Sequence, residues 1–311
     1  MNARQLKHFV AVVEAGNIQK AARSIHLTAP ALSISLKNLE DDLGVKLLHK
    51  GRNGVQMTYA GEVFLKGANS LLTEMDDLRA SLFEAEGSPA GKVRIGIPFG
   101  VSNAIAAPLF KIMLEEYPGI NLEIEEGVTT SLEHLFDNKL LDLMINYNAE
   151  NKFDQKCEIL YLEHMYLVSP YDPALDDVDE VKGEDLSLNP IVASPGTHSL
   201  RAMTEQYARG NGIEFDYLLD FKSGHASIKI VEEGLAHTIS PWSLIYDHVN
   251  TKLVSAQKIV EPQMERTAYM VSSLKKTPSA ATRITVEAIK RSLVEAVEKD
   301  HLRAHLYIDS F

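Results

Sequence analysis

The first 44 residues repeat apolar positions at helical spacing, with short polar breaks between the repeats. The first apolar stripe predicts a helix over residues 4–15 and consists of Leu6, Phe9, Val10 and Val13. Gly16 ends this helix and Asn17 caps the next one, whose apolar positions are Ile18, Ala21, Ala22 and Ile25. A third helix is expected between Thr28 and Gly44, and its buried face consists of Leu32, Leu36 and Leu39. Two short helices joined by a tight turn predict a helix-turn-helix, a motif whose second helix enters the major groove of DNA.

The outward face of this third helix is small, polar and basic around one apolar residue. Ile34 lies opposite the buried leucines, where it could contact a thymine methyl group. Alternatively, Ile34 packs against a neighbouring helix, if the helix is rotated from this assignment. Asn53 and Gly54 predict a tight hairpin turn directly after the helix, which makes a basic wing with Arg52 at its tip. The residues that we expect to face DNA are therefore Thr28, Pro30, Ala31, Ser33, Ile34, Lys37, Asn38, Arg52 and Asn53.

A long segment free of proline follows, from Tyr59 to about Glu86. Its apolar residues recur four and three positions apart, at Phe64, Ala68, Leu71, Met75, Leu78, Leu82 and Ala85. Such a heptad stripe on an otherwise acidic helix predicts pairing with the same helix of a second chain, and a helix-turn-helix usually reads two half-sites. Residues 86–91 read EGSPAG, which predicts the linker that ends the helix.

From Lys92 onward the pattern changes to short apolar strands that alternate with amphipathic helices. The segments KVRIGI, INLEIEEG and LLDLMI predict strands, and helices are expected between them. A similar cycle follows, and a long helix after Pro278 closes the chain. This alternation predicts a parallel α/β arrangement. In such sheets ligands bind at the carboxyl ends of the strands, beside helix N-termini.

The distribution of charge separates the two parts of the chain. The whole chain carries a net charge of −12, which by itself argues against nucleic acid as a partner. Residues 1–60, however, contain eight Lys and Arg against four Asp and Glu, and the excess of acidic residues lies mainly in residues 92–311. A small basic module attached to a large acidic body indicates that only one end of the molecule binds a polyanion such as DNA.

The residue content excludes several other classes of protein. The single cysteine, Cys157, excludes an internal disulfide framework and fits a reducing cytosol. No apolar run of about 18 residues and no signal peptide occurs, so we expect a cytoplasmic protein without a membrane partner. No catalytic motif is present, so we expect neither an enzyme nor a cofactor. His301 and His305 could bind a metal ion from an expected C-terminal helix, but they lack a third ligand, and a surface position is favoured.

Residues 9–61 resemble the winged helix-turn-helix of LysR-type transcriptional regulators. The resemblance rests on the paired alanines of the second helix and on the motifs LTAPALS, LEDDLG and TYAG. The family usually has Gln after the capping residue and Arg after PALS, whereas this chain has Ala29 and Ile34. The resemblance implies a homodimer or homotetramer that binds a palindromic promoter site in double-stranded DNA and responds to a small-molecule effector. It also implies RNA polymerase as a further candidate partner.

The acidic body resembles the regulatory domain of the same family more loosely, through YPGINLEIEEG, LLDLMI and EEGLAHTISP. This resemblance implies an α/β fold with two lobes of periplasmic-binding-protein type and the effector between them. The chain then divides into an all-α winged helix-turn-helix (1–58), a dimerisation helix with a hinge (59–91) and an effector-binding domain (92–311). Within that domain, lobe one comprises residues 92–162 and 267–311, and lobe two comprises residues 163–266.

Several strand-to-helix junctions in the two lobes carry hydroxyl groups, which suit a polar or anionic effector. Ser102 follows the first strand, although a hydroxyl there is also an ordinary helix cap. Trp242 could form a wall of the site or belong to the core of lobe two, and Arg201 could reach a carboxylate. The expected effector-binding residues are Phe99, Ser102, Asn103, Thr129, Thr130, Tyr147, Thr197, His198, Arg201, Pro241 and Trp242. The alternative function is a solute-binding protein or an enzyme of periplasmic-binding fold, neither of which would need the basic N-terminal module.

Overall fold

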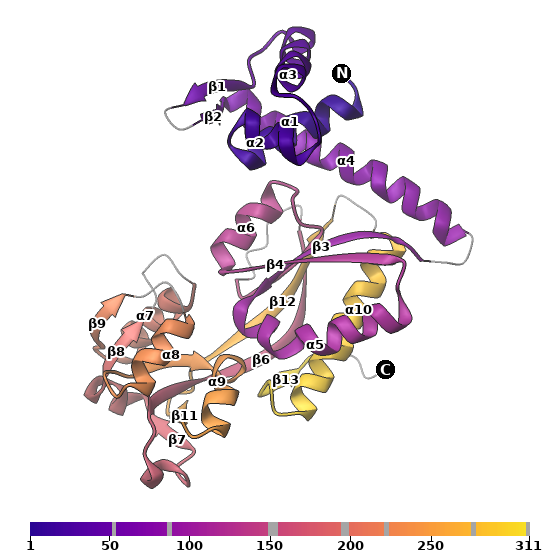
Figure 1. Ribbon diagram of the computed structural model, residues 1–311. Coiled ribbons are helices and arrows are strands. Elements are labelled where there is room, and N and C mark those ends of the chain that lie inside the picture. Colours follow the sequence, from indigo (N-terminus) through magenta and orange to yellow (C-terminus); the bar gives the residue numbers. More distant parts are fainter. Residues whose placement is uncertain are drawn as a thin grey trace.

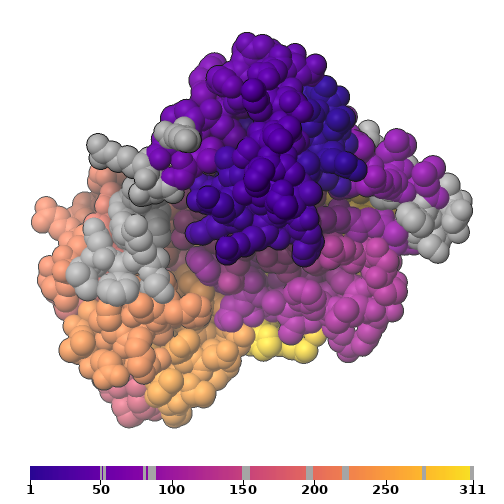
Figure 2. Space-filling view, turned by 45° about the horizontal axis from the view of Figure 1, so that its top comes forward, coloured from indigo at the N-terminus to yellow at the C-terminus, as the bar shows by residue number. Residues whose placement is uncertain are grey.

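The computed structural model describes most of the chain, in the ranges 1–51, 54–85, 89–148, 155–193, 199–220, 224–274 and 278–308. Figure 1 shows a small N-terminal module, one long helix and an α/β body made of two lobes. In the space-filling view the N-terminal module projects from the body (Figure 2). Within the described ranges, no helix is both long and apolar enough to cross a membrane.

Three helices form the core of the N-terminal module: α1 (Ala3–Ala15), α2 (Ile18–Ser24) and α3 (Ala29–Leu43). The predicted caps are confirmed, because the Asn17 side chain accepts hydrogen bonds from the first turn of α2 and the Thr28 hydroxyl accepts one from the Ala31 backbone NH. The three helices meet in one buried cluster, which contains Phe9, Val12, Ala21, Leu32, Leu36 and Leu39. In the first predicted stripe, Val10 and Val13 are only partly buried, and Val12, which the pattern left out, is buried instead. This part of the fold follows directly from helical periodicity and local capping.

The strands β1 (Leu48–Gly51) and β2 (Gly54–Met57) form the wing, which is pinned to the turn between α1 and α2. The Val55 backbone NH donates to the Gly16 carbonyl oxygen over 2.9 Å. Gly54 has φ of +144°, and a Cβ atom at this position would lie 2.2 Å from the same oxygen, so a side chain there would displace the wing. The predicted tip residues, Arg52 and Asn53, lie outside the described residues.

Helix α4 (Tyr59–Ala85) connects the module to the body, and its environment changes along its length. Its first turns belong to the core of the N-terminal module, where the Phe64 ring meets the Phe9 ring edge-on, with 5.0 Å between centroids. Farther along, the predicted apolar stripe is exposed at Leu71, Met75, Leu78 and Leu82. The Asn69 side-chain amide donates to the Asn138 carbonyl oxygen over 2.9 Å and thereby connects the helix to lobe one.

Lobe one is built on the strand order β4-β3-β5-β12-β6. Its parallel strands are β3 (Gly91–Pro98), β4 (Ile120–Gly127) and β5 (Leu143–Asn146). Its antiparallel strands are β12 (Glu265–Ser273) and β6 (Gln155–Pro170). The covering helices are α5 (Phe99–Glu116), α6 (Thr129–Asp137) and α10 (Ala280–Glu298). Because side chains alternate along a strand, α5 and α10 share a core with Ile145 on one face of the sheet, while α6 packs with Met144 on the other.

Lobe two continues the same sheet, because β6 runs through both lobes. The strands added there are β10 (Thr238–Pro241), β11 (Val254–Val260) and β7 (Glu180–Lys182). A separate parallel pair consists of β8 (Pro190–Ala193) and β9 (Asp216–Asp220). The helices are α7 (Ser199–Asn211), α8 (Gly224–Glu232) and α9 (Trp242–Asn250), with two short 3-10 helices, η1 (Pro173–Leu175) and η2 (Gly183–Leu188). The two lobes therefore share β6 and its sheet, and among the described strands only the β8–β9 pair forms a separate sheet in lobe two.

The C-terminal segment differs from the sequence prediction. Helix α10 ends at Glu298, and β13 (Ala304–Leu306) returns to pair with β6. The expectation that His301 and His305 share a helix face is therefore wrong, because Asp300 adopts a left-handed conformation, with φ of 56°, just after the helix end. His301 instead stacks on Tyr246, with 4.6 Å between the ring centroids. Among the described residues, no cluster of three His, Cys, Asp or Glu side chains could hold a metal ion.

Candidate functional sites

Helix α3 exposes to solvent every described residue that the sequence assigns to DNA. Its buried face consists of Leu32, Leu36 and Leu39. The exposed residues on and just before the helix are Thr28, Pro30, Ala31, Ser33, Ile34, Lys37 and Asn38. Ile34 does not pack against a neighbouring helix, since 60% of its surface is exposed. The outward face of α3 is therefore small and polar, with one apolar side chain near its middle.

Contacts with α1 and with the wing hold α3 in place. The Ser35 hydroxyl lies 2.7 Å from Nδ1 of His8 on α1. Near the end of α3, the Glu40 carboxylate accepts hydrogen bonds from the backbone NH groups of Leu47 and Leu48 and forms an ion pair with Lys46. Burial by itself would raise the pKa of Glu40, but the hydrogen bonds from these three residues lower it below its usual value. The outward face of α3 thus belongs to a helix anchored on two sides.

The charge on α3 changes sign along the helix. Lys37 is exposed on the outward face, while Lys20 and Arg23 are exposed on α2. The carboxylates of α3 all lie in its last turns, at Glu40, Asp41 and Asp42. Contacts between basic groups and phosphates supply most of the sequence-independent affinity for DNA. The N-terminal half of α3 is therefore the part that suits a DNA groove.

A cavity of about 290 Å³ lies between the two lobes. It is found at the carboxyl ends of β3 and β4, where the chain turns into α5 and α6. Its described lining consists of Pro98, Phe99, Gly100, Gly127, Val128, Thr129, Tyr147, Ser199, Leu200, Gly224, His225, Pro241, Leu244 and Arg266. Of the residues expected at an effector site, four line this cavity: Phe99, Thr129, Tyr147 and Pro241.

Five of the described helices begin at this cavity. Lobe one contributes the first turns of α5 and α6, and lobe two contributes those of α7, α8 and α9. In the described structure no side chain caps α5, α6 or α9, whose N-cap residues are Pro98, Val128 and Pro241. Uncapped first-turn NH groups and the positive end of each helix dipole favour an anion. These helix starts therefore favour an anion in the cavity, although most of its side chains are apolar.

Short polar contacts join the two lobes, one at the cavity and one about a turn along α5 from it. The Ser199 hydroxyl of α7 donates to the Thr129 hydroxyl of α6 over 3.2 Å. On the α5 side, the Asn103 amide donates to the Ser243 carbonyl oxygen of α9 over 2.9 Å. Residues of both lobes therefore form the walls of the cavity, and the Ser199–Thr129 hydrogen bond joins two of its lining residues.

Arg266 lies beside the cavity in a buried ion pair. Its Nε and Nη2 atoms both lie 2.7 Å from Oε1 of Glu163, which is completely buried, and its guanidinium group lies 3.6 Å from the centre of the Tyr147 ring. Burial disfavours the charge on Arg266, but Glu163 outweighs this effect and raises its pKa. Burial also raises the pKa of Tyr147, which keeps its hydroxyl protonated. The pair adds no net charge to the cavity.

Sequence reasoning missed this ion pair. Both residues lie on segments that were interpreted only as strands, YLEHMYLVS and ERTAYMVS. The available signal was a charged residue inside an apolar strand, since such residues are rarely buried without a partner. Because Glu163 and Arg266 are 103 positions apart, no local pattern could pair them.

Other predicted effector residues lie away from the cavity. Helix α5 begins at Phe99, so Ser102 and Asn103 lie about one turn into the helix and do not line the cavity. Thr130 is exposed next to the buried Thr129 and is not part of the lining either. Thr197 and His198 lie outside the described residues.

Trp242 belongs to the core of lobe two and not to the wall of the cavity. Only 3% of its surface is exposed, and its ring packs 5.4 Å from that of Tyr166, between centroids. Its indole NH donates to the Asp300 carbonyl oxygen over 2.7 Å, and the Arg303 guanidinium stacks 3.3 Å from the ring centre. The first turn of α9 therefore shows Pro241 and Leu244 to the cavity while the indole points into the lobe.

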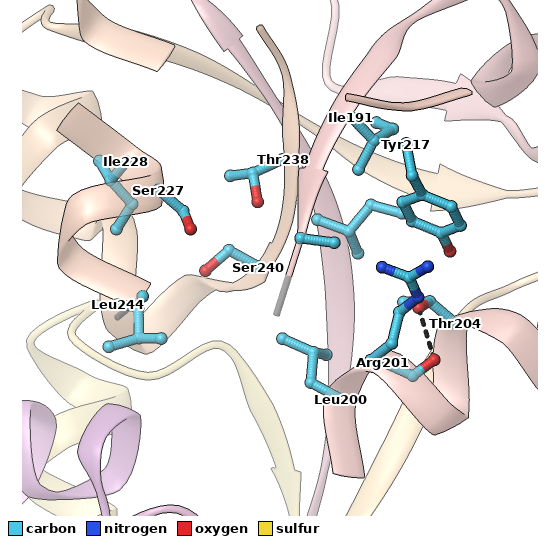
Figure 3. Close-up of a pocket in the computed structure, with 13 residues that line it drawn as sticks. Ile191, Leu200, Arg201, Thr204, Tyr217, Ser227, Ile228, Thr238, Ser240 and Leu244 are labelled. Carbon is cyan, nitrogen blue, oxygen red and sulfur yellow. Dashed lines mark hydrogen bonds between the residues drawn. The ribbon is translucent and has the colours of Figure 1, made fainter. Parts of the chain in front are cut away.

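Arg201 lines a separate, smaller cavity of about 40 Å³ inside lobe two (Figure 3). Its guanidinium lies 3.4 Å from the centre of the Tyr217 ring, and its Nε donates to Glu205 over 2.6 Å. Hydroxyl groups surround the space, from Thr204, Ser227, Thr238 and Ser240. Leu200, Gly224 and Leu244 line both cavities, so the small one lies directly beside the large one. Its volume suits a few water molecules or one small ligand group.

Comparison with known proteins identifies the families of the two parts of the chain. Residues 3–62 match the family "Bacterial regulatory helix-turn-helix protein, lysR family", and residues 86–294 match the family "LysR substrate binding domain". The nitrogen assimilation regulatory protein nac of Escherichia coli K12 is 29% identical over 180 residues, which cover 58% of this chain and 59% of nac. The transcriptional activator AaeR of the same organism is 31% identical over 125 residues, which cover 40% of each chain. The matched part thus spans less than two thirds of these relatives. They are transcription regulators and not enzymes, as expected from the absence of catalytic motifs.

Solved structures share the fold at low sequence identity. A full-length variant of OxyR from Pseudomonas aeruginosa superimposes with a TM-score of 0.73 at 20% identity and covers 94% of both chains. CbnR, a LysR family regulator solved in complex with its target DNA, superimposes with a TM-score of 0.65 at 22% identity, covering 94% of this chain and all of CbnR. The regulatory-domain match alone spans more than half of this chain. The chain therefore belongs to the LysR family of regulatory helix-turn-helix proteins.

Proposed function

We propose that this protein is a cytoplasmic, DNA-binding transcription regulator that is switched by a small anionic effector with an apolar body. The observation that carries this proposal is the convergence of five helix N-termini on an otherwise apolar interlobe cavity. Family membership supports the regulatory role, and the geometry of the cavity supports the class of effector.

The helix starts at the cavity favour a negatively charged effector. Among the described lining residues, Arg266 carries the only permanent charge, and Glu163 neutralises it. Each helix start adds a partial positive charge of about 0.5 elementary units. A single carboxylate, or another compact anion, can accept hydrogen bonds from these backbone NH groups without a side-chain counter-ion.

The walls of the cavity favour an effector that also has an apolar part. Phe99, Val128, Leu200 and Leu244 present apolar surface on several sides. An inorganic anion would leave this surface in contact with water, whereas an aliphatic or aromatic group would bury it. We therefore propose an amphipathic acid as the effector.

The DNA partner is a palindromic site bound by two copies of the N-terminal module. The exposed apolar residues of α4 support pairing of two chains, since Leu71, Met75, Leu78 and Leu82 form one exposed stripe along the helix. Pairing through α4 yields a homodimer, which can assemble further into a homotetramer, and RNA polymerase is the proposed further partner. Because Asn69 of α4 bonds to lobe one, a shift of the lobes would change the spacing of the DNA-binding modules.

The class of effector can be tested by thermal-shift measurements on matched pairs of carboxylic acids and their carboxamides. We expect small amphipathic acids to raise the melting temperature, and the uncharged carboxamides of the same shape to have little effect. Leu200→Trp should fill the cavity and abolish this stabilisation. Ser102→Ala is the matched control, because Ser102 lies in α5 but does not line the cavity, and this variant should keep the stabilisation by acids.

The regulatory role can be tested by footprinting on a promoter fragment with and without the acid that stabilises the protein. A regulator of the proposed kind changes its footprint when the effector binds. Equal stabilisation by acids and carboxamides would refute the anionic effector. An unchanged footprint would refute the switch, and a failure to bind any DNA would favour a simple solute-binding protein.

A further inference from the structure

The outward face of α3 has an apolar centre, and this centre bears on which bases the protein reads. On a helix with 100° between successive residues, Ile34 lies almost opposite the buried Leu32. Ala31 precedes it by one turn, while Lys37 and Asn38 follow by one turn. With 60% of its surface exposed, Ile34 is the most exposed large apolar side chain in the described part of α3.

A single exposed isoleucine on a protein surface would normally need no explanation. This one, however, lies at the middle of the face that a helix-turn-helix inserts into the major groove. In that groove the C5 methyl group of thymine is the one apolar substituent; apart from ring C–H groups, the other base-edge groups are hydrogen-bond donors or acceptors. Placed over guanine or cytosine, Ile34 would remove water from polar groups and return no hydrogen bond.

We propose that Ile34 is a specificity-determining residue that selects thymine at the centre of each half-site through its C5 methyl group. This inference rests on the proposed DNA-binding function and adds the base that is read. Ala31 is short enough to let the helix approach the same groove wall. Asn38, one turn farther, has the amide donor and acceptor that pair with adenine, so the two residues together favour A·T base pairs.

The distribution of charge along α3 supports a position of Ile34 deep in the DNA groove. The carboxylates Asp41 and Asp42 occupy the C-terminal end, which phosphate groups repel. The first three turns carry no carboxylate and include Lys37. The helix therefore enters the groove with its N-terminal part foremost, and Ile34 is the large apolar side chain of that part.

The expected change in affinity is modest for one half-site. In a palindrome the free-energy changes of the two half-sites add, so the fold-changes multiply. Burying one methyl group corresponds to about a fourfold change in affinity. A dimer that reads two half-sites should therefore lose about 15-fold when both methyl groups are removed.

The experiment begins with selection of binding sites from a pool of random DNA duplexes by the full chain. Each thymine of the selected site is then replaced by deoxyuridine, which pairs in the same way and lacks only the methyl group. Binding is measured for the wild type and for Ile34→Ala, whose exposed position makes the change compatible with folding. Val45→Ala, which shortens an exposed apolar residue just beyond α3, is the matched control.

We expect deoxyuridine at one position per half-site to weaken wild-type and Val45→Ala binding by about fourfold per half-site, and Ile34→Ala to be indifferent to it. Equal affinity of the wild type for thymine and deoxyuridine at every position would overturn the inference while leaving DNA binding intact. The same would follow if Ile34→Ala kept the full preference for thymine. If the wild type enriched no sequence at all, the proposed function would fail, and this inference with it.

Discussion

Replacement of Arg266 by methionine is the perturbation whose effect follows most directly from the structure. Both the Nε and the Nη2 atoms of Arg266 contact one carboxylate oxygen of Glu163, at 2.7 Å. Arg266→Met keeps most of the side-chain volume but leaves the Glu163 carboxylate, which is completely buried, without a counter-ion. Removing one member of a buried ion pair destabilises a protein by about 3–5 kcal/mol.

The expected loss can be measured as a change in melting temperature of the full chain. For a unit of about 150–250 residues, each kcal/mol corresponds to about 2–4 °C, so Arg266→Met should lower the melting temperature of the α/β body by about 6–20 °C. Glu163→Leu should have a similar effect, because it leaves the guanidinium unpaired. The double variant Glu163→Leu/Arg266→Met should be close to the wild type, since apolar residues often replace a buried pair without loss of stability.

A double variant as unstable as the sum of the two single variants would show that the residues act independently and would refute this reasoning. The same double variant also tests the origin of the anion affinity. Because the helix starts are proposed to supply it, amphipathic acids should still raise the melting temperature of the double variant. Loss of that stabilisation would instead assign the anion to Arg266.

Three further outcomes are expected. Gly54→Ala should destabilise the N-terminal module by about 1–3 kcal/mol and weaken DNA binding without affecting the α/β body, because φ is +144° at Gly54. The control Gly67→Ala, with open space around its Cβ, should be harmless, and equal behaviour of the two variants in a binding assay would contradict the role of the wing. Leu78→Glu should dissociate the oligomer, as seen in light scattering after size exclusion, because 66% of this residue is exposed in the single chain; an unchanged mass would exclude pairing through α4. Glu40→Ala should destabilise the module by about 1–3 kcal/mol at neutral pH, because two backbone NH groups lose their acceptor. Since the pKa of Glu40 is lowered on folding, its stabilising effect should be complete above the usual carboxyl range and disappear as the pH falls through the lowered value, so denaturation curves of variant and wild type should converge in acid.

Much of the candidate DNA surface could be predicted from the sequence, because its determinants are close together in the chain. The caps Asn17 and Thr28 lie within three residues of the groups that they bind, and the period of 3.6 residues alone separates Leu32 from Ile34. The rotation of α3 was left open by the pattern, and the packing of the three helices decided it. Ile34 is consequently exposed and available to DNA.

The effector cavity could be predicted only in part. The strand-to-helix junctions were found in the sequence, and Thr129 and Pro241 do line the cavity. Ser102 does not, because α5 begins at Phe99 and its hydroxyl is about one turn past the junction. A shift of a few residues in a helix start rotates a side chain away from a site, and hydropathy patterns do not define helix ends to that accuracy.

The sequence by itself determined the three helices of the basic N-terminal module, the long apolar stripe of α4 and the unusual position of Ile34. These features depend on residues a few positions apart, where spacing and caps act through local backbone geometry. The tertiary structure alone decided that Arg266 pairs with Glu163, that Trp242 turns into lobe two and that five helix starts share one cavity. Those outcomes depend on segments far apart in the chain, and the packing of the two lobes on a shared strand brings them together.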